Sequence, residues 1–586
     1  MDANAVPVPI VEVTCSNGEY PMVEPLSDKV SVGGVEFGES MERMHSNTTV
    51  SSPTEQAPRQ IFPPSISLLP KQASLLVSGI RRPSFVPSID FPNQGRGCMS
   101  EFDLKPPVWA YQPLKALYTV YFILITALIY LPFQAIVQMF RSNRGNPDWS
   151  WKRSMMVSFF RSCIVYICNT RVILTKQPPT TPPKLEKSEF VWLEPKDHIN
   201  VGVAAHPSKE CSDIRGELLR AMRLQGVSSK RISGYWFSTP GTHITISTPP
   251  RENEFVLYHL HGGAYWMGTS HENSQTAAMD MGILQRIAKD ESAKVLLQRA
   301  FTLEYRLANH TDHTHGSYPA ALVDALVGYL YLTRTCGFAP KNVIFTGDSS
   351  GGNLALALCR YLRDEKVAPM PGFLLLISPW CDVSRSHSGP LHAPNSFSST
   401  VMNKASDIID SSSKYRNTAV SALLGALPAR EAYLNPYISP VSLHLDSEHG
   451  AKPPFWGFLG FPEHVYILTG NSELNTEQHV TLAHRMAQGT HRGRPEYTGD
   501  RTSEGGDLHE YTWRDNFPRS HHALNRQTLN EVQGYDNPAL EDRDVALDEC
   551  KTGIHVFPLF SWFEPERGQA LDRIVQWIEQ KAFPSS

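Results

Sequence analysis

One stretch of the sequence constrains the fold more than any other, because it joins an apolar strand pattern, a glycine-flanked serine and a helical pattern without a break. The strand pattern is Asn342–Thr346, the serine lies in Gly347-Asp348-Ser349-Ser350-Gly351-Gly352, and the helical pattern starts at Asn353. A sharp turn from strand to helix strains the central residue, and only small neighbours such as glycine avoid a clash there. This context predicts that Ser349 is a nucleophile presented at the carboxyl end of a strand.

The alternative interpretation of this segment is a phosphate-binding loop. Such a loop carries a Lys-Ser or Lys-Thr pair after its glycines, whereas this sequence continues with Asn353-Leu354. A helix that begins directly behind Ser349 also points its first amides at a negative charge that develops there. We therefore interpret the segment as a catalytic turn.

From about residue 230, short apolar runs rich in β-branched residues alternate with longer helical patterns. This alternation is typical of a parallel sheet with crossover helices. We expect strands at His243–Thr248, Phe255–Leu260, Ala300–Tyr305, Asn342–Thr346, Phe373–Ser378 and Val465–Thr469. We expect helices at Ser274–Lys289, Tyr318–Cys336, Gly351–Asp364 and Ala570–Lys581. The sequence thus predicts an α/β domain over residues 230–583, with a mostly parallel sheet covered by helices on both faces.

Two segments interrupt the alternation. Residues 384–454 are rich in Ser, His and Asn, and residues 488–548 are rich in charge and Gly. We expect both to be insertions at the surface.

The chain before the sheet divides into three parts. Residues 1–102 mix Pro, Ser, Gly and polar clusters without a helical or strand period, which predicts disorder, and they lack the pattern of a cleaved secretory signal. Residues 116–140 form an uncharged apolar run that is long enough to span a bilayer as a helix; a buried or interfacial helix is the alternative. For residues 141–229 we expect amphipathic and cap helices with a linker, including a helix over 155–174 that lies on a bilayer.

Composition excludes some classes of function. The formal charge of -4 and the pI of about 6.6 provide no basic surface for a nucleic acid. The nine cysteines are dispersed and form no Cys-x-x-Cys pair, which argues against a disulfide scaffold or a zinc module. We expect no cofactor.

A second glycine motif, His259-Leu260-His261-Gly262-Gly263-Ala264-Tyr265, ends an earlier strand. Amides in such a loop bind the oxygen that becomes negative during attack on a carbonyl. We predict an oxyanion hole built from the amides of Gly262, Gly263 and Ser350, with His261 and Asp348 supporting the motifs. His259 and His261 could instead bind a metal, but no third ligand lies close by in the sequence.

Together these motifs resemble the hormone-sensitive-lipase-like family of α/β-hydrolases, which includes arylacetamide and sterol deacetylases. The resemblance spans residues 258–577 apart from the insertions, and it extends to Glu304-Tyr305-Arg306-Leu307-Ala308, Tyr318-Pro319-Ala320-Ala321-Leu322 and Ser378-Pro379-Trp380. Two features depart from the family pattern: Ala264 replaces a usual glycine, and the link over residues 309–315 is long and His-rich, which favours a polar loop over a metal site.

The resemblance implies a chain order of nucleophile, acid and histidine. It places the acid at Glu473, with Glu477 as the nearest rival, and the base at His555 in Gly553-Ile554-His555-Val556-Phe557. In this arrangement His555 takes the proton of Ser349, and the carboxylate orients and stabilises the imidazole.

The implied function is hydrolysis of short acyl esters, of the acetyl type, on lipophilic alcohols by a membrane-associated enzyme. The resemblance implies the endoplasmic reticulum as location; the flanking basic residues lean toward a cytoplasmic catalytic domain, whereas the sequons at Asn47 and Asn309 would be used only in the lumen. Two alternatives stay open: an amidase or acyltransferase with the same residues, and a non-catalytic, membrane-tethered binding protein.

Overall fold

The computed structural model describes residues 106–172, 179–200, 212–242, 244–246, 248–290, 295–310, 312–388, 398–409, 413–445, 457–500 and 540–583. All of these residues belong to one compact unit, Ser67–Ser586. The N-terminal region that we predicted to be disordered, residues 1–102, lies outside the described residues.

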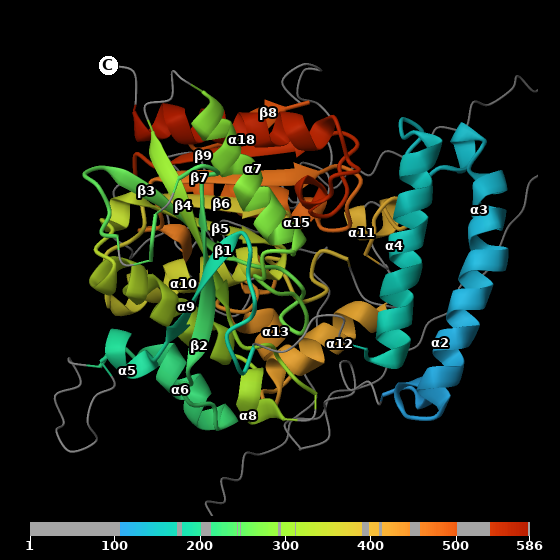
Figure 1. The fold of residues 1–586 in the computed structure, drawn as a ribbon, viewed down its shortest axis with the longest axis horizontal. Coiled ribbons are helices and arrows are strands. Elements are labelled where there is room, and N and C mark those ends of the chain that lie inside the picture. Colours follow the sequence, from blue (N-terminus) through green and yellow to red (C-terminus); the bar gives the residue numbers. More distant parts are fainter. Residues whose placement is uncertain are drawn as a thin grey trace, which may run out of the picture. The chain divides into compact units, whose positions relative to one another are not determined.

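The centre of the structure is a nine-stranded sheet in the order β1-β2-β4-β3-β5-β6-β7-β9-β8 (Figure 1). Only the β1–β2 and β2–β4 pairs are antiparallel, and every other pair is parallel. The strands are β1 Ser188–Leu193, β2 Ile232–Ser238, β3 Glu254–Leu260, β4 Leu296–Glu304, β5 Val343–Asp348, β6 Phe373–Ile377, β7 His464–Gly470, β8 Glu496–Gly499 and β9 Asp544–Cys550.

The strand order changes direction at β3, whose neighbours are β4 on one side and β5 on the other. The chain leaves parallel strands β3 and β5 at the same edge of the sheet, where ligands bind in open α/β sheets. This topology brings the loop after β3 next to the turn after β5, although about ninety residues of sequence separate Gly262 from Ser349.

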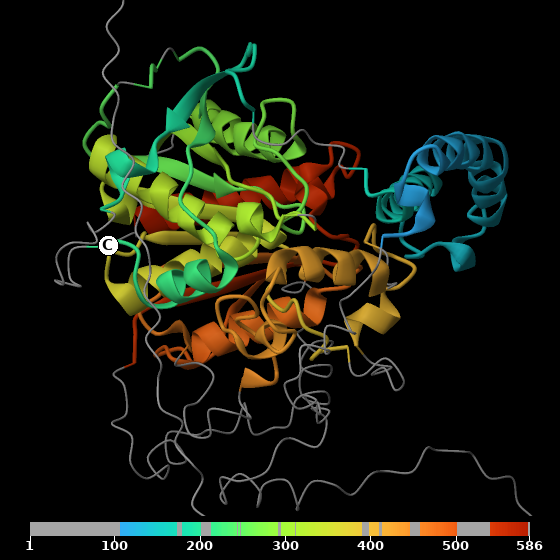
Figure 2. The same ribbon diagram turned by 90° about the horizontal axis from the view of Figure 1, so that it is seen from below.

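Helices cover both faces of the sheet, as Figure 2 shows. On one face α9, α10 and α15 contribute to one hydrophobic core, and on the other face α7 and α18 contribute to a second. The helices are α2 Leu114–Ile125, α3 Leu131–Val137, α4 Trp151–Thr170, α5 Pro195–His198, α6 Gly216–Gln225, α7 Gln275–Lys289, α8 His313–Gly316, α9 Ala320–Leu330, α10 Ser350–Glu365, α11 Ser399–Met402, α12 Ser413–Leu424, α13 Glu431–Leu434, α15 Thr476–Gln488 and α18 Glu566–Ala582.

The predicted α/β fold class is confirmed, and five of the six predicted strands correspond to β3, β4, β5, β6 and β7. The predicted strand His243–Thr248 is wrong, since its described residues lie in a turn-rich connection between β2 and β3. A prediction from alternation alone missed β2, because Ser233 and Gly234 interrupt its apolar pattern even though both are buried.

The prediction that residues 384–454 form a surface insertion is wrong for much of the segment. It contributes α11, α12 and α13, and α12 buries Ala419, Val420 and Leu423 in the larger core. Our bounds for the second insertion were also too wide. Both β8 and β9 begin within 488–548, while residues 501–539 lie outside the described residues.

One apolar helix extends over Leu114–Val137, with a π-helical turn at Thr126–Tyr130 between α2 and α3. It has a mean hydropathy of 2.1 and is the one helix, among the described residues, that is long and apolar enough to cross a membrane. Most of its large side chains are exposed, and Leu128 is 70% exposed. Behind it α4 packs between this helix and α12 rather than on an open surface (Figure 1).

Candidate active site

The turn between β5 and α10 holds Ser349 in a strained backbone conformation, with φ 51° and ψ -118°. Positive φ is rare for a residue with a side chain, and here two backbone hydrogen bonds hold Ser349 in this conformation. The Ser349 amide donates to Ile377 O at 2.9 Å, and its carbonyl accepts from the Trp380 amide at 2.8 Å. The end of β6 and the segment that follows it therefore hold Ser349 in this strained conformation.

Three predicted residues come together at this turn. Ser349 Oγ lies 2.9 Å from His555 Nε2, and His555 Nδ1 lies 2.9 Å from Glu473 Oε2. Neutral imidazole with its proton on Nδ1 donates to the carboxylate and accepts from the serine hydroxyl. This is the arrangement in which a histidine acts as general base toward a serine.

Glu473 is fully buried, and its second oxygen has partners of its own. Oε1 accepts from the Gly470 amide at 2.6 Å and from Ser378 Oγ at 3.0 Å. Burial by itself raises the pKa of Glu473, but the hydrogen bonds from His555 and Gly470 contribute to a pKa below the ordinary value. Glu473 is thus ionised and fixed.

The rival acid, Glu477, lies on the first turn of α15, where its amide donates to Ser399 Oγ at 3.4 Å. Burial raises its pKa to about 8, so its carboxyl group is mostly neutral at pH 7. A neutral carboxyl group cannot stabilise an imidazolium by charge, and the geometry therefore favours Glu473.

His555 is also almost completely buried, at 4% exposure. Burial lowers its pKa, but the hydrogen bond and charge of Glu473, together with the charge of Asp407, outweigh that effect and raise the pKa above 6.5. The protonated form that follows proton transfer from Ser349 is thereby stabilised.

The predicted oxyanion hole needs one correction, because the amide of Gly262 is already engaged. It donates to Asp348 Oδ1 at 2.9 Å, so it is not available to a substrate oxygen. The amides of Gly263, Ala264 and Ser350 have no acceptor within the described residues. Gly263 and Ala264 have φ of 115° and 54°, a loop conformation that alternation and motif spacing do not reveal. We assign the hole to Gly263, Ala264 and Ser350.

Asp348 connects the two glycine motifs, and a buried histidine supports it. His259 lies 3.2 Å from Asp348 Oδ1 and 2.6 Å from Asp280 Oδ1. Burial lowers the pKa of His259, but the two carboxylates outweigh this and raise it to about 9. A protonated His259 therefore balances the negative charge beneath the oxyanion loop.

His261 has a different set of partners from His259. Its Nδ1 lies 2.7 Å from Gly262 O, its ring stacks on Tyr305 at 4.2 Å, and burial lowers its pKa to about 4. The two histidines thus do not converge on a common point, and the described residues contain no group of three or more His, Cys, Asp or Glu in a metal-binding arrangement.

Sequence reasoning missed Asp407, which is fully buried beside the three catalytic candidates. Its Oδ1 accepts from the His555 amide at 3.0 Å, and its Oδ2 accepts from the Leu474 amide at 2.8 Å. One carboxylate therefore ties the loop of the base to the loop of the acid. Asp407 lies in the segment that we took for a surface insertion, and no motif marks it.

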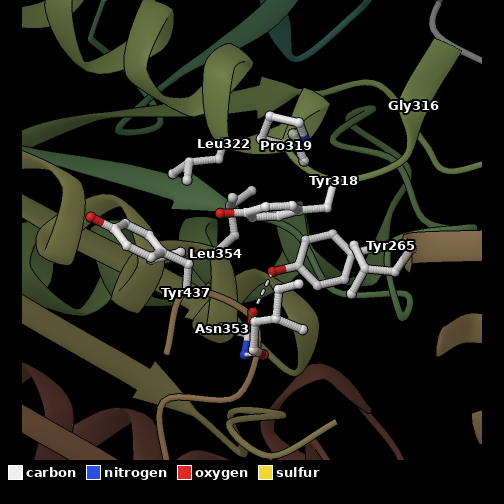
Figure 3. A pocket seen from close by; sticks show the side chains of 12 residues that line it. Tyr265, Gly316, Tyr318, Pro319, Leu322, Asn353, Leu354 and Tyr437 are labelled. Atoms are coloured by element: carbon white, nitrogen blue, oxygen red, sulfur yellow. Dashed lines mark hydrogen bonds between the residues drawn. The ribbon is translucent and has the colours of Figure 1, made fainter. Parts of the chain in front are cut away.

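Tyr265, which follows the oxyanion loop, lines a small cavity. A cavity of about 10 Å³ lies behind the first turn of α10, lined by Tyr265, Tyr318, Leu322, Asn353, Leu354 and Tyr437 among others (Figure 3). Tyr265 Oη donates to Asn353 Oδ1 at 2.6 Å across it. A cavity of this size holds about one water molecule.

On the other side, the oxyanion loop continues into an aromatic wall. Trp266, which is 2% exposed, contacts the rings of His310 and Tyr415, with centroid distances of 6.3 Å. Ile167 of α4 belongs to the same hydrophobic core. The larger hydrophobic core therefore includes side chains from both the oxyanion loop and α4.

Comparison with known proteins agrees with this geometry. A model of the alpha/beta hydrolase fold matches residues 257–494, which contain Ser349, Glu473 and the oxyanion loop. The sheet domain has the alpha/beta hydrolase fold. The predicted resemblance to the hormone-sensitive-lipase-like members of this fold is confirmed.

Individual relatives of this chain match over shorter stretches. It is 32% identical over 154 residues to an acetyl-hydrolase of Streptomyces hygroscopicus, covering 25% of this chain and 44% of that protein. It is 30% identical over 166 residues to an esterase of Acinetobacter venetianus, covering 28% and 44%. It is 34% identical over 79 residues to steryl acetyl hydrolase 1 of Saccharomyces cerevisiae, covering 14% and 18%. The chain therefore spans less than half the length of these relatives.

Among solved structures, a hormone-sensitive lipase from a metagenome library is similar at 20% identity and a TM-score of 0.37, covering 60% of this chain and 82% of that chain. We draw no conclusion from a likeness at this level.

Labelling of Ser349 by a fluorophosphonate should depend on pH through His555. The reaction needs neutral His555, whose pKa is raised above 6.5, so the rate should fall with decreasing pH with a midpoint above 6.5. Glu473→Gln removes the charge that raises this pKa. It should therefore move the midpoint to lower pH and slow labelling by roughly 10³- to 10⁴-fold. The measurement is the labelling rate from pH 5 to 9.

Glu477→Gln is the matched control for this experiment. Since Glu477 is mostly neutral at pH 7, an amide there should leave both the rate and the midpoint close to those of the wild type. A larger decrease of the labelling rate in Glu477→Gln than in Glu473→Gln would contradict our choice of Glu473 as the acid.

Asp407→Asn should slow the same labelling reaction. An asparagine keeps one acceptor oxygen but turns an NH₂ group toward a backbone amide, which leaves a buried donor unpaired at a cost of about 1–3 kcal/mol. We expect roughly a tenfold to hundredfold slower rate, together with a small shift of the midpoint to lower pH, because Asp407 contributes to the raised pKa of His555.

Asp382→Asn provides the comparison, since Asp382 is equally buried and accepts hydrogen bonds from Ser384 and Ser386 away from the triad. It should lower the melting temperature without moving the pH midpoint. An unchanged midpoint in Asp407→Asn would contradict the electrostatic role of Asp407.

Proposed function

We propose that this protein is a membrane-associated serine hydrolase that cleaves short acyl esters of lipophilic alcohols through an acyl-enzyme. The observation that supports this most strongly is the hydrogen-bonded series Ser349–His555–Glu473, with distances of 2.9 Å at both steps, beside amides that have no acceptor among the described residues. A binding protein would have no need for a strained serine aligned with a base and an acid.

The proposed reaction has two halves. In the first, Ser349 Oγ attacks the ester carbonyl carbon while His555 Nε2 takes the serine proton, and the carbonyl oxygen binds the amides of Gly263, Ala264 and Ser350. The C–O bond to the alcohol then breaks, and His555 returns the proton to the leaving alkoxide. In the second, His555 takes a proton from water, whose oxygen attacks the acyl carbon. The bond to Ser349 then breaks, and Ser349 regains its proton as the carboxylic acid leaves.

The substrate class is supported by two observations. The relatives named acetyl-hydrolase, esterase and steryl acetyl hydrolase support ester cleavage, with acetyl as the acyl group. The aromatic side chains Trp266 and Tyr415, which lie close together after the oxyanion loop, support a lipophilic alcohol. Apolar contact of this kind binds lipophilic groups without directional hydrogen bonds.

Membrane association is supported by the helix Leu114–Val137. Its 24 residues rise about 36 Å at 1.5 Å per residue, compared with a hydrocarbon core of about 30 Å. The side chains of Leu117, Leu124 and Leu128 are all more than half exposed. Exposure of such an apolar surface to water costs considerable free energy, whereas contact with lipid chains does not. Location in the endoplasmic reticulum stays a prediction.

The central test is hydrolysis of 4-nitrophenyl esters, from acetyl to long acyl chains, by the detergent-purified full chain and by its Ser349→Ala variant. We expect kcat/KM to be highest for acetyl and to fall as the chain lengthens, because two of the relatives are named as acetyl hydrolases. Ser349→Ala should lose at least about 10³-fold in kcat. Absence of turnover in the wild type, with no fluorophosphonate labelling of Ser349, would favour the non-catalytic alternative.

The membrane proposal is tested by flotation with phosphatidylcholine vesicles and an alkaline carbonate wash. The wild type should stay with the vesicles. The double variant Leu124→Lys and Leu128→Lys should be released, since each lysine near the centre of a spanning helix costs roughly 2.5–3.5 kcal/mol. Leu224→Lys, at an exposed leucine of α6, is the matched control and should stay bound. Equal release of the wild type by carbonate would contradict a spanning helix.

A further inference from the structure

The turn between the apolar helix and α4, residues 138–150, contacts the loops that hold the catalytic candidates. We call it the connector. Its first contact is with the loop of the acid: Asn146 Nδ2 donates to Ser472 Oγ at 2.9 Å, and Ser472, which is 3% exposed, directly precedes Glu473. A change in the position of Asn146 would therefore displace Ser472, which is one residue from the catalytic carboxylate.

The second contact is with the loop of the base. Trp149, which is 1% exposed, donates from Nε1 to Thr552 O at 2.9 Å. At the start of α4, Arg153 binds both carboxylate oxygens of Glu566 at 2.6 Å, and Glu566 also accepts from Thr552 Oγ1 at 2.9 Å. These hydrogen bonds thus fix Thr552, which lies three residues before His555.

The third contact is with the segment that carries Asp407. A Cβ atom on Gly145 would lie 2.4 Å from Ala405 O and 2.8 Å from Ser406 Cα, distances that no side chain tolerates. The two backbones therefore touch directly, one residue before Asp407. Asp407 in turn binds the amides of both other loops.

The connector is stiff because its own groups are tied together. Arg144 donates to Gln138 O at 3.0 Å and to Trp149 O at 2.7 Å, which joins the two ends of the turn. Trp151 Nε1 donates to Ala135 O at 2.9 Å, which joins α4 to α3. The apolar helix, the connector and α4 should therefore move as one body (Figure 1).

We propose that the connector is a positioning element through which a lipid bilayer regulates the triad: a bilayer that holds the apolar helix seats the connector on the loops of Glu473, His555 and Asp407. This rests on the proposed function. With the connector seated, the Ser349–His555–Glu473 distances are those of the described structure. Without a bilayer the helix samples other orientations, and small displacements at the three loops lower the rate of the chemical step.

The test compares the full chain in phosphatidylcholine vesicles and in detergent, with 4-nitrophenyl acetate as substrate. The wild type should show a kcat several-fold higher in vesicles. Asn146→Ala loses one hydrogen bond to the acid loop and should lower kcat in vesicles about fivefold, with KM unchanged. Its kcat should then approach that of the wild type in detergent.

Gly145→Ala tests the same idea by steric means, since its new methyl group pushes the connector away from Ala405. It should give the same loss of kcat as Asn146→Ala or a larger one. If Gly145→Ala does not fold, the kcat of Asn146→Ala in vesicles still tests the proposal. The matched control is Asn143→Ala, because Asn143 lies in the same turn but donates to Val137 O of its own hairpin. It should keep the wild-type kcat in both environments.

A wild-type kcat that is equal in vesicles and detergent would overturn the proposal, and so would an Asn146→Ala variant with wild-type kcat in vesicles. Failure of the proposed function is distinguishable from either result. It would leave the wild type without turnover and without fluorophosphonate labelling of Ser349 in both environments.

Discussion

The strained turn at Ser349 is the constraint on which the rest of the site depends. A residue with positive φ at the end of a buried strand needs close packing around it, and this chain achieves it with small neighbours. A Cβ atom on Gly351 would lie 1.9 Å from Leu260 O, and one on Gly347 would lie 2.5 Å from Gly351 C. The turn therefore presses directly against the end of β3, so the nucleophile and the oxyanion loop are positioned by the same contact.

Around this turn, buried charge is arranged so that each ionised group has partners. His259 lies between Asp280 and Asp348, and His555 lies beside Glu473, with Asp407 near its backbone. A buried carboxylate without such partners would take up a proton instead of staying charged. The charge and hydrogen bond of Glu473 and the charge of Asp407 raise the pKa of His555 above its ordinary value, which favours its taking a proton from Ser349.

The loops that carry these groups come from distant parts of the chain. The acid follows β7, the base follows β9, Asp407 comes from the segment between β6 and β7, and the connector precedes the first strand. Since loops are less constrained than the sheet that bears them, their mutual hydrogen bonds are what maintain catalytic distances. In our proposal, the apolar helix joined to such loops is the physical path from a bilayer to the candidate active site.

The sequence by itself determined the α/β class and most of the central strands, and it predicted Ser349 as the candidate nucleophile, because strand patterns and the glycine-flanked turn are local properties. Family resemblance supplied Glu473 and His555, which lie far from any local signal. Only the tertiary structure decided that Gly262 is engaged by Asp348 and that Ala264 is free. It also decided that Asp407 belongs to the site and that β2 is a strand in spite of Ser233 and Gly234. Each of these findings depends on contacts across the sheet or between loops. Such contacts cannot be read from neighbouring residues in the sequence.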